Sequence, residues 1–289
     1  MHPIAFRLPD GLPFIGGTPI TSFGIFMFLA FLTAGLVLRS ELKRTGYDPE
    51  KAWDFVFMAV IGGIVGAKVY YVLLNFPRLQ EDGLSFVFSR GGMVWYGGFL
   101  GATALVVWEI RRSKLPLGRM ADLHAVALAP AYAVGRIGCF LVGDDYGRPT
   151  TVPWGIRFPE GTPPTTVTNL EAYFGIEVDP ALVERYGQVL PVHPTQLYEV
   201  GISTLIFLLL WRLRGHKHAW GWLFMVWLVA AGFERGFVEI FRAKDDRFFG
   251  VLTLAQVLSL GLVVVGVVGM QRLSEPGASE SRSVRGARS

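Results

Sequence analysis

A cluster of charged residues near position 240 has the types and the spacing to bind an anion. Arg235, Glu239 and Arg242 are four and three positions apart in an apolar stretch, so a helix would carry them on one face. Arg136 lies near the end of a second apolar stretch. Because a charge inside a bilayer is costly, each such group is by default a functional hypothesis. A planar guanidinium matches the oxygens of a phosphate, so the pattern indicates a phosphate site near a membrane surface.

The alternative is that these arginines only hold helices together. Glu239, Glu199 and Asp144 are available as ion-pair partners. Two arginines at a similar predicted depth in two different helices favour the phosphate site over simple pairing. We therefore expect Arg136 and Arg235 to converge toward the outer headgroup layer.

The elements that must position these residues are apolar spans. The chain has 289 residues, of which 52% are hydrophobic and 17% charged, whereas a soluble domain carries about 25% charged residues. About 20 apolar residues cross the hydrocarbon as a helix, and no alternating barrel strands are visible. The sequence predicts an all-α integral membrane protein with about seven transmembrane helices. The expected spans are residues 19–38, 53–74, 93–110, 123–142, 197–211, 220–241 and 252–270.

Basic residues set the expected orientation. Lys and Arg cluster after the first, third and fifth spans and in the tail, which places the N-terminus outside and the C-terminus in the cytoplasm. The same placement in short loops explains the net charge of +4 without a nucleic acid partner. The single Cys139 excludes an intrachain disulfide and a cysteine zinc site. No metal or cofactor is implied.

The expected organisation has four parts. Residues 1–142 hold spans one to four, and residues 195–272 hold spans five to seven. Between them, residues 143–194 are rich in Pro, Thr and Gly and are predicted to form a small extracytoplasmic head. Residues 273–289 are rich in Ser, Gly, Arg and Glu, which predicts a disordered cytoplasmic tail.

Four segments together resemble the prolipoprotein diacylglyceryl transferase family. They are residues 91–98 (GGMVWYGG), 135–148 (GRIGCFLVGDDYGR), 193–199 (HPTQLYE) and 235–242 (RGFVEIFR). Each segment alone is a weak signal, but the set occurs in the family's order and is specific. The resemblance implies a multi-pass enzyme of the bacterial cytoplasmic (inner) membrane, with its active site toward the outer leaflet. It would transfer the diacylglyceryl group of phosphatidylglycerol to the lipobox cysteine of a prolipoprotein and release glycerol 1-phosphate, without a cofactor.

The resemblance also implies roles for individual residues. The predicted catalytic residues are Arg136, Arg235, Tyr96 and Glu239. The predicted substrate-binding residues are Arg136, Asp144, Gly147, Arg242, His193, Phe23 and Cys139. By resemblance, Arg136 and Arg235 stabilise the phosphate of the leaving group.

The chain departs from the family's pattern at five positions, three of them within these segments. Cys139 stands for the family's Asn, Asp144 for its Glu, Phe23 and Ala231 for tyrosines, and Tyr96 for a histidine that is a candidate base. The resemblance therefore does not identify the group that takes the proton from the thiol.

Tyr96, His193, Glu239 and Asp144 are the candidates for that base. An ordinary tyrosine, with a pKa near 10, is a poor base.

Two other functions fit parts of the pattern. A non-catalytic paralogue that binds phosphatidylglycerol or lipoprotein precursors would accommodate the departures. A transporter of an anionic solute would use the arginines, but the apolar inner halves of the fourth and sixth spans give it no polar route.

Overall fold

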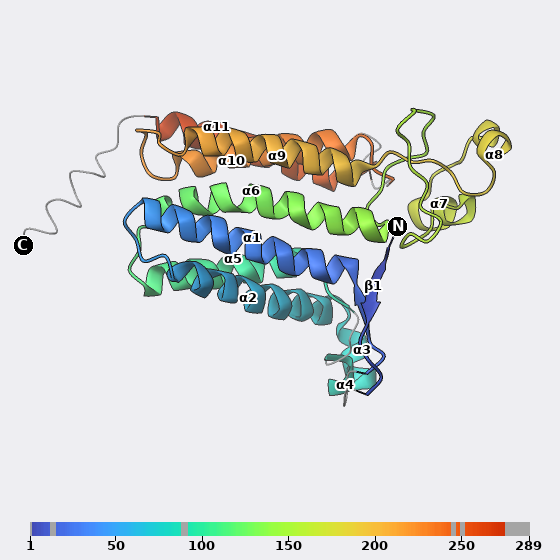
Figure 1. The fold of residues 1–289 in the computed structure, drawn as a ribbon, viewed down its shortest axis with the longest axis horizontal. Coiled ribbons are helices and arrows are strands. Elements are labelled where there is room, and N and C mark those ends of the chain that lie inside the picture. Colours follow the sequence, from blue (N-terminus) through green and yellow to red (C-terminus); the bar gives the residue numbers. More distant parts are fainter. Residues whose placement is uncertain (1, 12–15, 88–91, 244–246, 249–251, 275–289) are drawn as a thin grey trace, which may run out of the picture. The chain divides into compact units, whose positions relative to one another are not determined.

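The computed structural model describes residues 2–11, 16–87, 92–243, 247–248 and 252–274 (Figure 1). Residue 91 of the first motif and residues 275–289 of the predicted tail lie outside this set. The elements in chain order are β1 (Ile4–Arg7), β2 (Pro19–Thr21), α1 (Ser22–Arg44), α2 (Lys51–Leu74), α3 (Phe76–Asp82), α4 (Leu84–Val87), α5 (Trp95–Arg112), α6 (Leu117–Val142), α7 (Val167–Phe174), α8 (Pro180–Tyr186), α9 (Thr195–Leu213), α10 (Trp222–Glu239), β3 (Arg247–Phe248), β4 (Leu252–Thr253) and α11 (Leu254–Arg272).

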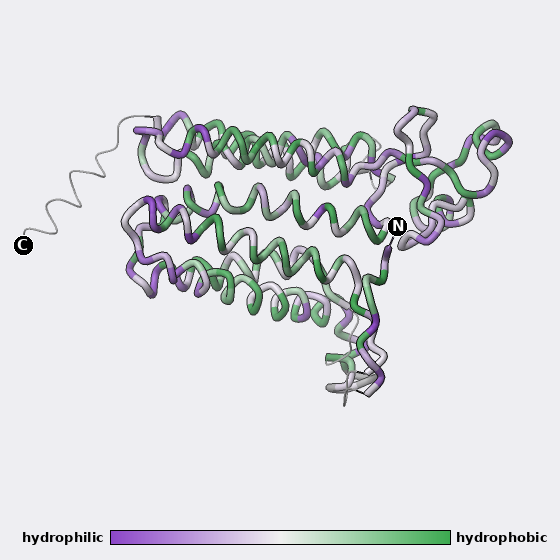
Figure 2. Tube along the Cα trace, in the orientation of Figure 1, coloured by the Kyte–Doolittle hydropathy of each residue, from purple (hydrophilic) through white to green (hydrophobic). Residues whose placement is uncertain are grey.

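Long apolar helices dominate the described residues. Among them, α1, α2, α6, α9 and α11 are long and apolar enough to cross a membrane, by length and composition. Figure 2 shows apolar residues along their length and hydrophilic residues gathered toward helix ends. The two other predicted spans, in α5 and α10, are also helical, with 18 residues each. The structure is therefore mostly helical and consistent with an all-α membrane protein.

Short strands correct two predicted span boundaries. The first helix begins at Ser22 instead of residue 19, because Pro19–Thr21 pairs antiparallel with Ile4–Arg7. The last helix begins at Leu254 instead of residue 252. There, Thr253 and Gln256 form a capping box that bonds both free backbone N–H groups reciprocally.

The chain divides into two compact units. In the unit Gly35–Leu123, α2 and α5 pack backbone against backbone. A Cβ on Gly62 would overlap the carbonyl of Gly101, and one on Gly66 would overlap the carbonyl of Gly97. The small-xxx-small spacing of these glycines therefore serves close helix packing, as the sequence indicates.

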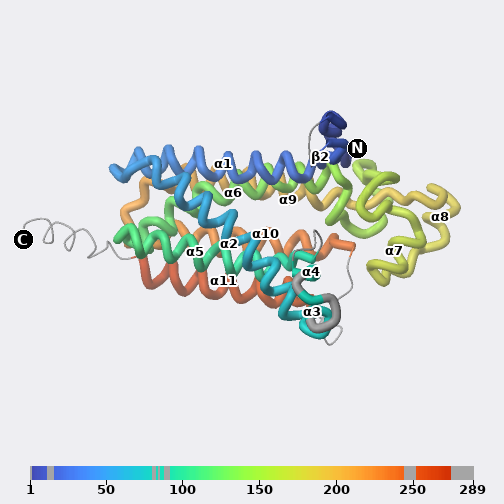
Figure 3. Tube along the Cα trace, turned by 90° about the horizontal axis from the view of Figure 1, so that it is seen from below, coloured from blue at the N-terminus to red at the C-terminus, as the bar shows by residue number. Residues whose placement is uncertain are grey.

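The other unit comprises Met1–Ala34 and His124–Ser289. In it, α10 packs against both α9 and α11 (Figure 1 and Figure 3). Two glycines allow the close approach of α10 and α11, since a Cβ on Gly232 would lie 2.8 Å from the Ser259 carbonyl and one on Gly266 would lie 2.8 Å from that of Met225. Helices α10 and α11 therefore pack closely together.

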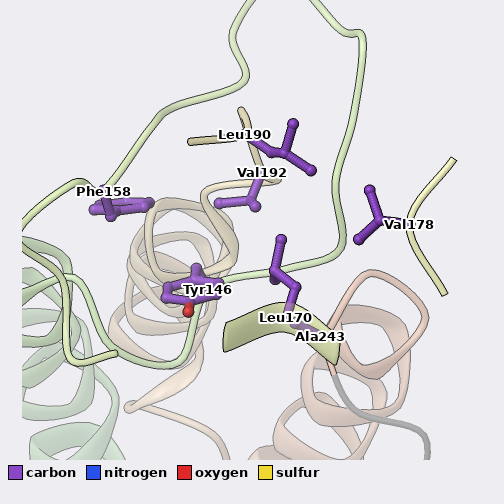
Figure 4. Close-up of a cluster of buried hydrophobic side chains, with 7 residues drawn as sticks. All are labelled: Tyr146, Phe158, Leu170, Val178, Leu190, Val192 and Ala243. Atoms are coloured by element: carbon purple, nitrogen blue, oxygen red, sulfur yellow. The ribbon is translucent and has the colours of Figure 1, made fainter. Parts of the chain in front are cut away.

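Residues 143–194 build a small hydrophobic cluster of their own (Figure 4). The Tyr146 and Phe158 rings stack at 5.7 Å, and the Tyr146 hydroxyl donates to the Pro163 carbonyl at 2.9 Å. Ala243, just beyond α10, completes the cluster. The buried members are Tyr146, Phe158, Leu170, Val178, Leu190, Val192 and Ala243. The segment is thus folded against the end of α10.

Candidate active site

Arg136 is held on α6 by groups from three directions. Its Nε and Nη2 donate to the Tyr132 hydroxyl, one helical turn earlier, at 3.0 and 2.9 Å. Its Nε also lies 3.0 Å from Glu199 Oε2, and its Nη1 lies 2.7 Å from Asp145 Oδ2. The Tyr132 hydroxyl in turn donates to Glu199 Oε1 at 2.7 Å. The Arg136 side chain is only 15% exposed, and these contacts fix the position and direction of its guanidinium.

Asp145 joins Arg136 to a second guanidinium. Its other oxygen, Oδ1, accepts from Arg242 Nη2 at 2.5 Å. Burial raises the pKa of Asp145, but Arg242 and Arg136 outweigh it and lower the pKa to about 2. The same ion pair outweighs burial at Arg242 and raises its pKa. The carboxylate is thus ionised at any working pH.

Glu239 continues this row of charges to Arg235. Its Oε2 lies 3.8 Å from Arg242 Nε and 2.6 Å from Arg235 Nη2. We call Arg136, Asp145, Arg242, Glu239 and Arg235 the charge row. Its arginines come from two segments that are about 100 positions apart in the sequence.

Arg242 does not lie on the helix where the sequence predicted it. Helix α10 ends at Glu239, and Arg242 lies in the following turn, where it forms a β-bridge with Gly147. Arg148 N–H donates to the Phe241 carbonyl at 2.7 Å, so this carbonyl is bonded to the 143–148 segment instead of continuing the helix. Arg242 Nε nevertheless lies 3.8 Å from Glu239 Oε2.

Arg235 differs from Arg136 in the donors it leaves unused. Its Nη1 is buried and has no hydrogen-bond partner among the described residues. A buried donor without a partner is costly, and functional sites are where such groups occur. Arg235 therefore offers a ready donor to an incoming anion, whereas the donors of Arg136 are largely engaged.

Helix α9 presents a buried polar stripe to this site. Gln196, Glu199 and Ser203 are spaced by three and four positions and are each at most 2% exposed. Gln196 Nε2 donates to the Asp144 carbonyl, and Ser203 Oγ donates to Glu234 Oε1 at 2.6 Å. This stripe gives the charge row a fixed polar support in an otherwise apolar helix.

Asp144 lies beside the charge row but outside it. Burial raises its pKa to about 6, and the neighbouring charge of Asp145 adds to that rise. Its Oδ1 is buried without a hydrogen-bond partner among the described residues. Cys139 is a buried free thiol, and its Sγ lies 3.6 Å from Arg136 Nη1.

Ligand atoms of Cys139, Asp144 and Asp145 lie within 4.8 Å of one another. The two guanidiniums on Asp145 work against a cation there, so this group gives no reason to revise the expectation of no metal.

His193 forms a polar and aromatic cluster with its neighbours. Its Nδ1 lies 3.0 Å from the Tyr198 hydroxyl, which also accepts from Trp154 Nε1 at 2.8 Å. The Trp154 indole N–H can only donate, so the Tyr198 hydroxyl accepts from it. All three side chains are then satisfied when Tyr198 donates its own proton to His193 Nδ1. Burial lowers the pKa of His193. Its Nδ1 is therefore already used and is poorly placed to take a proton from a substrate.

Gly147 is required by close packing. Its N–H donates to the His193 carbonyl at 2.8 Å. A Cβ there would lie 2.5 Å from the Phe241 carbonyl oxygen and 2.7 Å from His193 Cβ. Only glycine lets the 143–148 segment pass between His193 and the turn that carries Arg242.

Phe23 and Tyr96 lie on other elements. Phe23 is in the first turn of α1, and its Cα would lie 3.5 Å from a Cβ on Gly138 of α6. Tyr96, at the start of α5, belongs to the unit Gly35–Leu123, where its ring meets the Trp95 ring edge-on at 5.3 Å. A catalytic role for Tyr96 stays a prediction.

Sequence reasoning misses two residues of this site. For Asp145, the family motif points instead to its neighbour Asp144. Tyr132 looks like one more aromatic on an apolar helix, yet its position four residues before Arg136 predicts contact with it. The expected convergence of Arg136 and Arg235 stays a prediction, because Asp145, Arg242 and Glu239 lie between them along the charge row.

Comparison with known proteins agrees with the motifs. Residues 11–272 match the family model described as prolipoprotein diacylglyceryl transferase. Relatives named phosphatidylglycerol–prolipoprotein diacylglyceryl transferase include one from Solidesulfovibrio magneticus, 32% identical over 88% of this chain and 90% of its own. Others are from Paracidovorax citrulli, 31% identical over 93% and 94%, and Clostridium tetani, 27% identical over 92% and 96%.

Proposed function

The chain belongs to the prolipoprotein diacylglyceryl transferase family, and we propose that it transfers the diacylglyceryl group of phosphatidylglycerol to the lipobox cysteine of prolipoproteins. The observation that carries this proposal is the charge row, which sets three guanidiniums beside one another at the ends of α6 and α10. Such a row suits a lipid phosphate whose charge increases when it becomes a leaving group.

In the reaction one bond forms, one bond breaks and one proton is transferred. The thiolate sulfur attacks the glyceryl carbon that bears the phosphate, a thioether C–S bond forms, and the C–O bond to the phosphate breaks. Glycerol 1-phosphate leaves with the bonding electrons. The thiol proton goes to a base, since thiolate is the nucleophile. Arg235 Nη1 is a donor for the leaving phosphate that costs no existing hydrogen bond.

Among the candidates, we propose Asp144 as the base. A general base works best with a pKa near the working pH, and burial raises that of Asp144 to about 6. Glu239 is occupied by Arg235, and His193 Nδ1 by Tyr198. A role for Tyr96 as the base stays a prediction.

The proposed membrane placement has seven spans. Helices α5 and α10, at about 1.5 Å per residue, are about 27 Å long, close to the ~30 Å hydrocarbon core. Each packs along an apolar helix of spanning length, α2 or α11. With basic residues held inside, the N-terminus is outside, the 143–194 segment is an extracytoplasmic head and the charge row faces the outer leaflet.

Turnover by the purified full chain tests the proposal. The protein in detergent receives phosphatidylglycerol and a lipobox peptide, and the peptide mass is followed. We expect a diacylglyceryl mass gain whose rate falls about 10²–10³-fold in Arg136→Ala and in Arg235→Ala. Arg185→Ala, in the last turn of α8, is the matched control and should keep the wild-type rate. Lipid binding by folded protein without any mass gain would contradict the transferase and indicate a non-catalytic lipid-binding paralogue.

A further inference from the structure

The Asp145 carboxylate holds two guanidiniums in the way a phosphate would. One oxygen contacts Arg136 and the other contacts Arg242, at 2.7 and 2.5 Å. Two non-bridging oxygens of a phosphodiester carry the same single charge and suit the same two donors. A carboxylate of the chain thus occupies the position between two arginines that an anionic headgroup needs.

Charge balance favours release of this contact. The ion pairs match Arg136, Arg235 and Arg242 one for one with Asp145, Glu199 and Glu239. Asp144, beside them, adds a further negative charge when it is ionised as the base. A phosphate added to this balanced set would be an extra, partly desolvated negative charge, which is unfavourable. Release of one carboxylate would offset this cost when the phosphate binds.

Asp145 is the carboxylate best placed to leave. Its side chain is 38% exposed, whereas those of Glu199 and Glu239 are 0% and 2% exposed. Its backbone stays anchored, because Thr195 Oγ1 donates to its carbonyl at 2.7 Å and Gln196 bonds that of Asp144. A rotation of the Asp145 side chain alone would open the position.

We propose that Asp145 is an internal anion that occupies the phosphate position in the free protein, and that a phosphate-bearing lipid binds by exchanging with it at Arg136 and Arg242. The inference rests on the proposed function, because that function supplies the phosphate. The exchange keeps the two arginines paired and aligned when no lipid is bound. It also makes the site specific for phosphate-bearing lipids, since a lipid without phosphate carries no anion that can replace the Asp145 carboxylate.

Direct lipid binding tests the exchange without needing turnover. Binding of phosphatidylglycerol and of diacylglycerol, which lacks the phosphate, is measured for wild type and Asp145→Asn in the same detergent. We expect Asp145→Asn to bind phosphatidylglycerol roughly tenfold more tightly, because a charged competitor is removed. Diacylglycerol binding should not change. Glu171→Gln, which removes an exposed charge from α7, is the matched control and should bind as wild type does.

Unchanged or weaker phosphatidylglycerol binding by folded Asp145→Asn would overturn the exchange and make Asp145 a fixed bridge. If that variant does not fold, a structure of the wild type with glycerol 1-phosphate decides. The expected result is both guanidiniums on the phosphate and Asp145 rotated away, and retention of both Asp145 contacts beside the bound phosphate would overturn it. Tighter phosphatidylglycerol binding by Asp145→Asn, without thioether formation by the wild type, would contradict the transferase function and support the exchange. Thioether formation by the wild type, without tighter binding by Asp145→Asn, would support the transferase function and contradict the exchange.

Discussion

The hydroxyl of Tyr132 offers a sensitive test of how Arg136 is positioned. Tyr132→Phe removes one oxygen that donates to Glu199 and accepts twice from Arg136. Arg136 keeps its contacts with Glu199 Oε2 and Asp145, so the largest loss is the donor to buried Glu199. A hydrogen bond to a charged group contributes about 1.5–3 kcal/mol. If that energy holds the guanidinium in its productive position, the rate should fall roughly 10- to 100-fold.

The assay compares the initial rates of peptide lipidation by wild type and Tyr132→Phe at saturating phosphatidylglycerol. Tyr173→Phe is the matched control, because Tyr173 is 71% exposed on α7 and should keep the wild-type rate. Thermal unfolding in detergent shows whether both variants are folded. A rate within twofold of wild type for folded Tyr132→Phe would refute the idea that this hydroxyl positions Arg136.

Two further predictions concern the neighbouring segment. Gly147→Ala should lower the free energy of unfolding by about 1–3 kcal/mol, and with it the unfolding temperature, because the new Cβ would overlap Phe241 and His193. Gly201→Ala on α9 is the control: a Cβ there has nothing within 4 Å, so this change should be neutral or slightly stabilising. Equal unfolding temperatures for the two would contradict the packing argument. The lipidation rate should rise as the pH increases through about 6 and then level off, because Asp144 acts as a base only when ionised. Asp144→Asn should abolish this pH dependence and lower the rate at least 10²-fold. If the variant keeps the pH dependence, Asp144 is not the base.

The sequence predicts the long helices well and the short elements poorly. Runs of about 20 apolar residues have one favourable structure in a bilayer, so helices such as α2 and α9 are found close to their predicted positions. The hairpin of β1 and β2 and the helices α7 and α8 are short, and contacts that are distant in sequence decide where they form. The early end of α10 at Glu239 has the same cause, since Arg148 bonds the following turn.

The candidate site divides in a similar way. Arg136, Arg235 and Glu239 could be found because charges are rare and costly in apolar helices. Asp145 could not, since its partners Arg136 and Arg242 are 9 and 97 positions away in the sequence. Its left-handed backbone, with φ near 54°, is also a product of the folded segment. Which acidic residue of an adjacent pair meets the arginines is decided by that local conformation.

The fate of the lipid phosphate tests the central claim most directly. Phosphatidylglycerol labelled at its phosphate is given to the purified protein with a lipobox peptide, and the label is followed together with the peptide mass. Diacylglyceryl transfer predicts one labelled glycerol 1-phosphate released for each peptide that gains an unlabelled diacylglyceryl thioether. Label on the peptide, or a failure to form either product by folded, lipid-binding protein, would contradict the assignment of the charge row to a leaving phosphate.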